Sequence, residues 1–203
     1  MRLFIAVNFD STVKNKIIVT QNHIREKTAK GRFTAPENLH LTLAFLGETA
    51  EDRVPEIQEA IKQSVLVEEP AVKPFSLVFS KAGFFKRGGK ELWHLGLAED
   101  NSGGEVILKK LQRRLTKELL DRGFYIDKRP FTAHITLGRE IQYGTGGGLW
   151  PFETEKIIIP VKRISLMLSL HTRDHDKKNK LSYTELFGFD LARENIQPQY
   201  FCI

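Results

Sequence analysis

One short polar pattern occurs twice in this chain, and it constrains the fold more than any other feature. Segment 40–43 reads HLTL and segment 134–137 reads HITL, so each is a histidine, an apolar residue, a threonine and a second apolar residue. In a β-strand alternate side chains share a face, which places each histidine beside its threonine and turns the apolar residues into a core. An unpaired buried imidazole or hydroxyl is costly, so a polar strand face needs a purpose. Two copies predict a duplicated unit whose halves place two histidines across a shared cleft.

Two opposed imidazoles suit acid–base chemistry at a phosphate ester. One takes a proton from the nucleophile and the other gives a proton to the leaving group. Free imidazole titrates near pH 6.5, so one histidine can be neutral while its mate is protonated. Threonine hydroxyls can donate to the non-bridging phosphate oxygens. We therefore interpret His40, Thr42, His134 and Thr136 as catalytic. The alternative, two satisfied core histidines, fits one such strand better than two.

Composition indicates an ordinary soluble globular protein. The 203 residues suffice for a sizeable core, and 41% hydrophobic with 28% charged content is typical of this class. The one cysteine, Cys202, excludes a disulfide framework, favours a reducing cytoplasm and is a poor nucleophile candidate near a chain end. The first apolar run, residues 3–7, is far shorter than the roughly 20 residues of a membrane helix. We expect a cytoplasmic protein without a membrane partner.

The charge balance favours an anionic partner. The net charge is +6, and lysine and arginine cluster in segments 81–90, 109–114, 122–129 and 173–180. A basic balance points above all to nucleic acid. Each cluster taken alone is equally consistent with a solvated helix face.

Hydrophobic periodicity and turn residues predict mixed helices and strands. Helices are expected over 11–27, 51–67 and 104–122, and strands over 2–8, 40–46, 75–79, 91–97, 131–139, 157–159, 161–171 and 181–189. Segment 80–90 reads as a basic hairpin loop, and segments 143–151 and 172–180 read as further loops. No linker or composition break divides the chain. We predict one α+β domain over residues 1–203, built from two pseudo-symmetric lobes.

The sequence around the two motifs resembles a known superfamily. Segments 2–6 (RLFIA), 37–47 (ENLHLTLAFLG) and 129–139 (RPFTAHITLGR) are similar to the 2H phosphoesterases, and more narrowly to the bacterial and archaeal RNA 2′,3′-cyclic phosphodiesterases, also called 2′-5′ RNA ligases. The resemblance runs from Arg2 to about Phe189. It implies a LigT-like fold in which antiparallel sheets line a central cleft and helices lie outside.

The resemblance also implies an activity. It is metal-independent hydrolysis of a terminal 2′,3′-cyclic phosphate to a 2′-phosphomonoester, without a cofactor, on RNA ends such as tRNA halves, by a monomer. His40, Thr42, His134 and Thr136 are carried over as the catalytic tetrad. We assign His134 as the base and His40 as the acid, although the two motifs are nearly symmetric. In the reverse reaction, the same site would join a 2′,3′-cyclic phosphate end to a 5′-hydroxyl.

Phe45 and Arg139 each follow their histidine by five positions. Strand parity turns them away from the cleft, so a role in binding requires the chain to bend near Gly47 and Gly138. The resemblance implies that they flank the terminal nucleobase by stacking and cation–π contact. Alternatively, Arg139 contacts phosphate. A further possibility is that Phe45 is a core residue and Arg139 a surface charge, with no role in binding.

The remaining candidate residues are interpreted as structural. His171 and His175 lie four apart in a lysine-rich turn, which favours a surface loop over a metal site. His94 and His23 are expected to be structural, and Trp93 is expected in the core. The glycines at 144–148 lack the order of a phosphate-binding loop.

Three further hypotheses concern an RNA-binding surface, other substrates and a protein that binds without catalysis. Together with Trp93, the pair Phe84 and Phe85 beside Lys86 and Arg87 is consistent with an aromatic and basic RNA surface, although Trp93 itself is expected in the core. Other substrates are also consistent with the tetrad, namely a 2′-5′ oligoadenylate or a small cyclic nucleotide. A non-catalytic module that binds RNA ends is the third alternative, and the intact His/Thr pairs argue against it.

Overall fold

The computed structural model describes residues 1–66, 71–88, 90–100, 102–143, 149–173 and 179–191. Cys202, His175 and the glycines at 144–148 lie outside the described residues, as do 174–178 of the predicted charged loop. None of the helices in the described part is long and apolar enough to cross a membrane.

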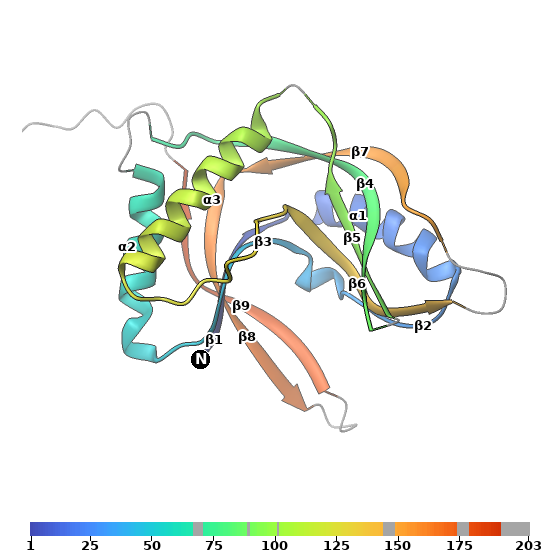
Figure 1. The fold of residues 1–203 in the computed structure, drawn as a ribbon, viewed down its shortest axis with the longest axis horizontal. Helices are drawn as coiled ribbons and strands as arrows, with labels where there is room; N and C mark the ends of the chain where they lie inside the picture. The colour runs from blue at the N-terminus through green and yellow to red at the C-terminus, as the bar shows by residue number, and fades with distance from the viewer. Residues whose placement is uncertain (67–70, 89, 101, 144–148, 174–178, 192–203) are drawn as a thin grey trace, which may run out of the picture.

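Helices and strands alternate along the chain (Figure 1). The helices are α1 (Ser11–Glu26), α2 (Val54–Leu66) and α3 (Gly104–Asp121), with short 3-10 turns at Pro36–Asn38 and Glu51–Arg53. The strands are β1 (Arg2–Asn8), β2 (Thr28–Phe33), β3 (His40–Glu48), β4 (Phe75–Arg87), β5 (Lys90–Leu97), β6 (His134–Tyr143), β7 (Phe152–Val161), β8 (Arg163–Arg173) and β9 (Asn179–Asp190).

All the described strand pairs are antiparallel and form one continuous path. The order is β7-β4-β5-β6-β3-β1-β8-β9, and β2 pairs with β6. Within the part of the chain that the structure describes, β3 and β6 are joined through the single pair Leu41↔Ile135. The sheet therefore consists of two half-sheets, β7-β4-β5-β6 and β3-β1-β8-β9, that meet at the two H-x-T strands. The expected α+β class, with antiparallel sheets and outer helices, is confirmed.

The helices cover the two ends of the molecule (Figure 1). Helix α1 packs against β7 and β2, whereas α2 and α3 pack together and contact β8, β9, β3 and β4. Their bounds follow local signals in the sequence. The Asp10 carboxylate accepts a hydrogen bond from the Val13 amide at 2.8 Å and caps α1. Gly123, at φ 76°, adopts the left-handed conformation just beyond α3.

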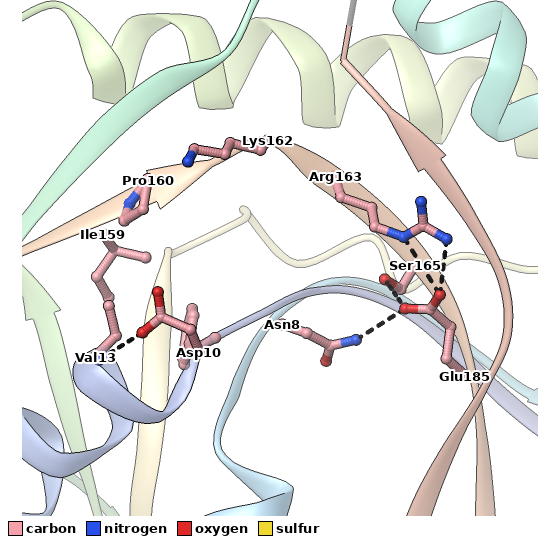
Figure 2. A pocket seen from close by; sticks show the side chains of 10 residues that line it. Asn8, Asp10, Val13, Ile159, Pro160, Lys162, Arg163, Ser165 and Glu185 are labelled. Atoms are coloured by element: carbon pink, nitrogen blue, oxygen red, sulfur yellow. Dashed lines mark hydrogen bonds and ion pairs between the residues drawn. The ribbon is translucent and has the colours of Figure 1, made fainter.

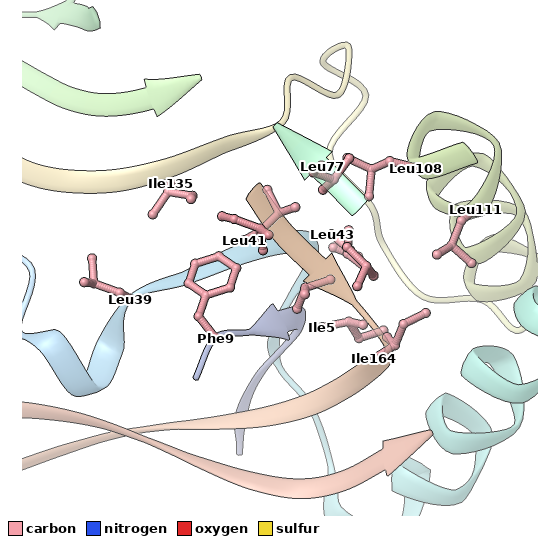
Figure 3. Close-up of a cluster of buried hydrophobic side chains, with 14 of the residues drawn as sticks. Ile5, Phe9, Leu39, Leu41, Leu43, Leu77, Leu108, Leu111, Ile135 and Ile164 are labelled. Carbon is pink, nitrogen blue, oxygen red and sulfur yellow. The ribbon is translucent and has the colours of Figure 1, made fainter. Parts of the chain in front are cut away.

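One hydrophobic core serves both half-sheets. Leu41 and Ile135, the pair that joins the halves, are fully buried, and Ile5 of β1 and Leu77 of β4 belong to the same cluster (Figure 3). Leu108 of α3 packs into this cluster as well. The two halves therefore share their apolar interior.

Two expectations about the elements are wrong. Strand β2 was not predicted, because Thr28–Phe33 (TAKGRF) has few apolar residues and lies at the edge of β6. The predicted hairpin loop over 80–90 is mostly strand, because β4 continues to Arg87 and pairs with β5 through Gly83↔His94 and Lys86↔Glu91. β4 ends at Arg87, and the residue that follows, Gly88, has φ 57° in the left-handed region.

Candidate active site

Both histidine–threonine pairs lie on one face of the joined sheet. Residues paired directly across a sheet point to the same side, and Leu41↔Ile135 point into the core. Their neighbours His40, Thr42, His134 and Thr136 must therefore point to the opposite side, which we call the open face. All four side chains are half-buried there. The structure thus brings together the four residues that the sequence predicted.

The same backbone contact orients both imidazole rings. Nδ1 of His40 lies 2.7 Å from the carbonyl oxygen of Asn38, and Nδ1 of His134 lies 2.8 Å from that of Thr132. A carbonyl only accepts hydrogen bonds, so Nδ1 carries the proton in each ring and Nε2 is the reacting nitrogen. Asn38 is itself buried and donates from its amide to the Leu181 carbonyl at 2.8 Å, which ties this turn to β9.

Thr42 contacts the reacting nitrogen of His40, and Thr136 lies across the strand junction. Thr42 Oγ1 is 2.9 Å from Nε2 of His40, so the hydroxyl donates to this nitrogen when the ring is neutral. Because β3 and β6 are antiparallel, Thr136 lies at the His40 end of the junction and Thr42 lies at the His134 end. A phosphate between the two histidines would therefore have a hydroxyl from each strand beside it.

Positive charge converges on His40. Burial lowers the pKa of His40 below its usual 6.5, and the charges of Arg139, His134 and Lys14 lower it further, while the bond to the Asn38 carbonyl opposes the shift. These cations come from β6 and α1. An anion placed between them would relieve their mutual repulsion. The electrostatics thus suit a bound phosphate.

A β-bulge in each H-x-T strand brings Phe45 and Arg139 to the open face. The β1–β3 register passes from Ala6↔Thr42 to Ile5↔Ala44 and skips Leu43. The β5–β6 register passes from His94↔Thr136 to Trp93↔Gly138 and skips Leu137. One extra residue reverses the alternation. The bend expected at Gly47 and Gly138 is therefore replaced by bulges one to four residues earlier.

Phe45 and Arg139 both lie on the open face. Phe45 is 49% exposed and pairs with Phe4, and the Phe4 ring is 4.9 Å from the His40 ring. The Arg2 guanidinium lies 5.2 Å from the centre of the Phe45 ring. Arg139 acts electrostatically on both His40 and Tyr183.

Glutamines from the covering helices support both bulges. Gln21 of α1 is buried and donates to the Leu137 and Thr34 carbonyls, each at 2.8 Å. Gln112 of α3 donates to the Leu43 carbonyl at 3.4 Å. A bulge interrupts strand pairing, so these side chains supply donors that the ladder does not. The two halves repeat this device around equivalent residues.

Aromatic rings frame both histidines. Phe4 and Tyr183 contact the His40 ring, with centroid distances of 4.9 and 5.2 Å. Phe85 and His94 each lie 5.8 Å from the His134 ring. His94, expected to be structural, lies on the open face opposite Thr136. An isolated histidine in a strand gives no sequence signal that separates these two roles.

Comparisons with known proteins identify the family of this chain. The family model described as LigT like Phosphoesterase matches residues 7–91. An RNA 2′,3′-cyclic phosphodiesterase of Archaeoglobus fulgidus is 34% identical over 143 residues, which cover 68% of this chain and 72% of that protein. One of Thermotoga maritima is 31% identical over 159 residues, covering 78% and 76%. The chain belongs to the 2H phosphoesterase superfamily.

Solved structures of similar proteins share the fold over nearly the whole chain. A protein of Thermus thermophilus superposes with a TM-score of 0.72 at 25% identity, covering 96% of this chain and 100% of that one. Escherichia coli LigT complexed with 3′-AMP superposes with a TM-score of 0.68 at 25% identity, covering 95% and 98%.

A pocket with both polar and apolar lining residues lies at the end of β1, next to the pair that joins Asn8 to His40 (Figure 2). Asn8, which pairs with His40, reaches Glu185 at 3.4 Å. Glu185 also accepts from Ser165 at 2.6 Å and from Arg163 at 3.0 Å. Three of the polar side chains that line this pocket are thus bonded to Glu185.

Two further candidates lie away from the open face. Trp93 is fully buried, as expected for a core residue. Lys86 lies over the Phe84 ring at 5.5 Å, and Phe84 packs against Trp93, on the core side of the sheet. The predicted aromatic and basic surface is therefore wrong in part, because Phe85 and Lys86 alternate along one strand. In the described part of the chain, no three His, Cys, Asp or Glu side chains form a group that could hold a metal.

Proposed function

We propose that this protein hydrolyses RNA 2′,3′-cyclic phosphate ends to 2′-phosphomonoesters. The observation that carries the proposal is the pair of histidines, each fixed through Nδ1 on a backbone carbonyl, on one open face with two threonines. The two relatives reported above are RNA 2′,3′-cyclic phosphodiesterases. Because every group comes from one chain, we infer that a monomer is the active unit.

The proposed reaction is one in-line displacement. His134 accepts a proton from water through Nε2 as the water oxygen bonds to phosphorus. The bond from phosphorus to O3′ breaks, and His40 gives its Nε2 proton to that oxygen. Thr42 and Thr136 donate to the non-bridging oxygens, and Arg139 and Lys14 supply positive charge. Water and the cyclic diester are thereby converted to the 2′-phosphomonoester with a free 3′-hydroxyl.

The lowered pKa of His40 suits this division once substrate is bound. A neutral His40 cannot act as an acid, and in the free protein burial and its cationic neighbours favour that neutral form. The cyclic phosphate carries a negative charge, which stabilises the protonated ring. Substrate binding therefore favours the protonated form of His40, which can act as the acid. The reverse reaction would attach a 5′-hydroxyl at the same phosphorus, giving a 2′-5′ linkage.

The substrate class follows from charge. The net charge of +6 favours a polyanion, and we propose an RNA strand with a cyclic end, tRNA halves included. No step of the proposed mechanism needs a metal ion. The protein is expected to act in the cytoplasm.

The test is turnover of an oligoribonucleotide bearing a 2′,3′-cyclic phosphate in the presence of EDTA. We expect a 2′-phosphomonoester product and full activity under chelation. His40→Ala and His134→Ala should each lose on the order of 10²–10⁴-fold in kcat. The double variant should lose less than the product of the two losses, since both groups act in one step.

Trp150→Ala, at an exposed aromatic of the segment before β7, is the matched control and should keep wild-type activity. A single histidine variant with near-wild-type turnover would rule out the two-histidine mechanism. Turnover of cyclic mononucleotides or 2′-5′ oligoadenylate alone would transfer the assignment to those substrates. Binding without turnover would indicate a module that only recognises RNA ends.

A further inference from the structure

Phe85 and His94 form a flat aromatic stack beside the proposed base. Their ring centroids lie 4.2 Å apart with an interplanar angle of 11°. Each of the two rings is also T-shaped to the His134 ring, with a centroid distance of 5.8 Å. Stacking on His94 covers one face of Phe85, and this side chain is still 45% exposed. Single exposed aromatics are common on protein surfaces, but this one is seated on a second ring at the active site.

Two glycines keep the surroundings of the stack free of side chains. Gly83 pairs with His94, and a Cβ there would meet the His94 ring at 3.5 Å. Gly96 pairs with His134, and a Cβ there would lie 3.9 Å from Cδ2 of His94. Any larger side chain at these positions would extend along the ring or over the backbone next to His134. Gly83 and Gly96 thus add no side chain beside the His94 ring.

His94 is suited to stacking and unsuited to proton transfer near neutral pH. Burial and the charge of His134 lower the pKa of His94 to about 4, although the Leu92 backbone opposes the shift. The ring therefore stays neutral beside His134. A second cation at this position would oppose protonation of His134 during the reaction.

We propose that the Phe85–His94 stack is the platform for the second nucleobase of the RNA, the base preceding the cyclic end. This inference rests on the proposed function. Base–aromatic stacking is tolerant of sequence, because every base has a flat face. The platform would give the enzyme a preference for RNA ends over cyclic mononucleotides without reading sequence.

The position of the platform separates it from the terminal base. Phe45 on β3 is the proposed neighbour of the terminal base, and Phe85 on β4 lies three strands away. Strands are spaced by about 4.8 Å, so the two rings are roughly 14 Å apart across the sheet. One base cannot touch both. The reacting phosphate is assigned to the junction of β3 and β6, so the terminal base can reach Phe45 on β3, while the base of the preceding nucleotide, joined through the 5′-phosphate of the terminal ribose, reaches Phe85 on β4.

The experiment compares two substrates that differ in this one base. A dinucleotide with a terminal 2′,3′-cyclic phosphate is assayed beside its analogue with an abasic ribose at the first position. Wild-type kcat/KM should favour the intact dinucleotide about ten-fold or more, given the usual strength of base–aromatic stacking. In Phe85→Leu this ratio should fall close to one. Phe85→Tyr and the exposed control Trp150→Ala should both retain it.

The outcomes separate the platform from the reaction itself. If wild type turns over both substrates and Phe85→Leu keeps the full ratio, the platform is rejected while the proposed function stands. If Phe85→Leu slows both substrates by the same factor, Phe85 acts through His134 or through the fold, and the platform is again rejected. If wild type turns over neither cyclic substrate, the function is rejected and the platform with it.

Discussion

The surroundings of His40 disfavour its protonated form, whereas its proposed role as the acid requires that form. Burial and the nearby charges of Arg139, His134 and Lys14 lower its pKa in the free protein. A bound anion favours the protonated form, so its pKa should rise on binding. The binding energy that depends on this proton is fully present below the free-protein pKa and is lost as pH rises through the pKa of the complex.

We therefore predict that inorganic phosphate or 3′-AMP raises the pKa of His40 and that binding takes up a proton near neutral pH. The measurement is an NMR titration of the histidine Cε1 protons with and without the anion, with the His40 signal assigned by its loss in His40→Ala. His94, with its pKa near 4, provides an internal reference that should stay neutral. An unmoved His40 titration would favour the opposite division, with His40 as the base.

At the scale of single elements, the bulges decide which residues reach the site. Counting along β3 and β6 by strict alternation turns Phe45 and Arg139 away from the histidines. The skipped residues Leu43 and Leu137 reverse this outcome. The tetrad was predictable because each of the two copies of the motif is contained in four consecutive residues. The bulges were not, because they depend on partner strands and on helix side chains distant in sequence.

The bulge at Leu137 depends on Gln21, whose buried amide donates to the Leu137 and Thr34 carbonyls. Gln21→Leu removes both donated bonds and leaves the Thr34 carbonyl without this donor. We expect a loss of about 1–3 kcal/mol in the free energy of unfolding. Urea denaturation at constant m-value measures it. The activity of the folded fraction should also fall, since Arg139 follows the bulge.

Gln112 and Asn22 provide the comparisons for this variant. Gln112→Leu should cost less, because its bond to the Leu43 carbonyl is long, at 3.4 Å, and the side chain is only half-buried. Asn22→Ala, next to Gln21 on the exposed side of α1, should leave the unfolding midpoint almost unchanged. Equal midpoints for Gln21→Leu and wild type would mean that the bulge is held by the strands alone.

At the scale of the whole molecule, one strand junction produces both the shared core and the shared site. The half-sheets meet at Leu41↔Ile135, and this junction aligns the two histidines on one face while it merges the two interiors. The single domain over residues 1–203, predicted because no linker or composition break divides the chain, stays a prediction. The duplication was visible in the sequence because the proposed chemistry requires the same residue types in both motifs, whereas the cores of the halves need only be apolar.

The net charge of +6 leads to a prediction about salt. An oligonucleotide presents several phosphates, whereas a cyclic mononucleotide presents one. Each neutralised phosphate adds roughly 0.7 to the slope of log affinity against log salt for a single strand. KM for a cyclic-ended oligonucleotide should therefore rise with salt more steeply than KM for the mononucleotide.

Position on the molecule, and not net charge alone, should set this slope. Lys14 of α1 acts on His40, whereas Lys86 lies over Phe84 on the core side of β4. Lys14→Gln and Lys86→Gln each remove one positive charge, so they form a matched pair. Steady-state KM across a salt series should give a slope reduced by about 0.7 for Lys14→Gln and an unchanged slope for Lys86→Gln. Equal slopes for both variants would mean that the anion responds to the overall charge, and the phosphate contact assigned to the open face would then be withdrawn.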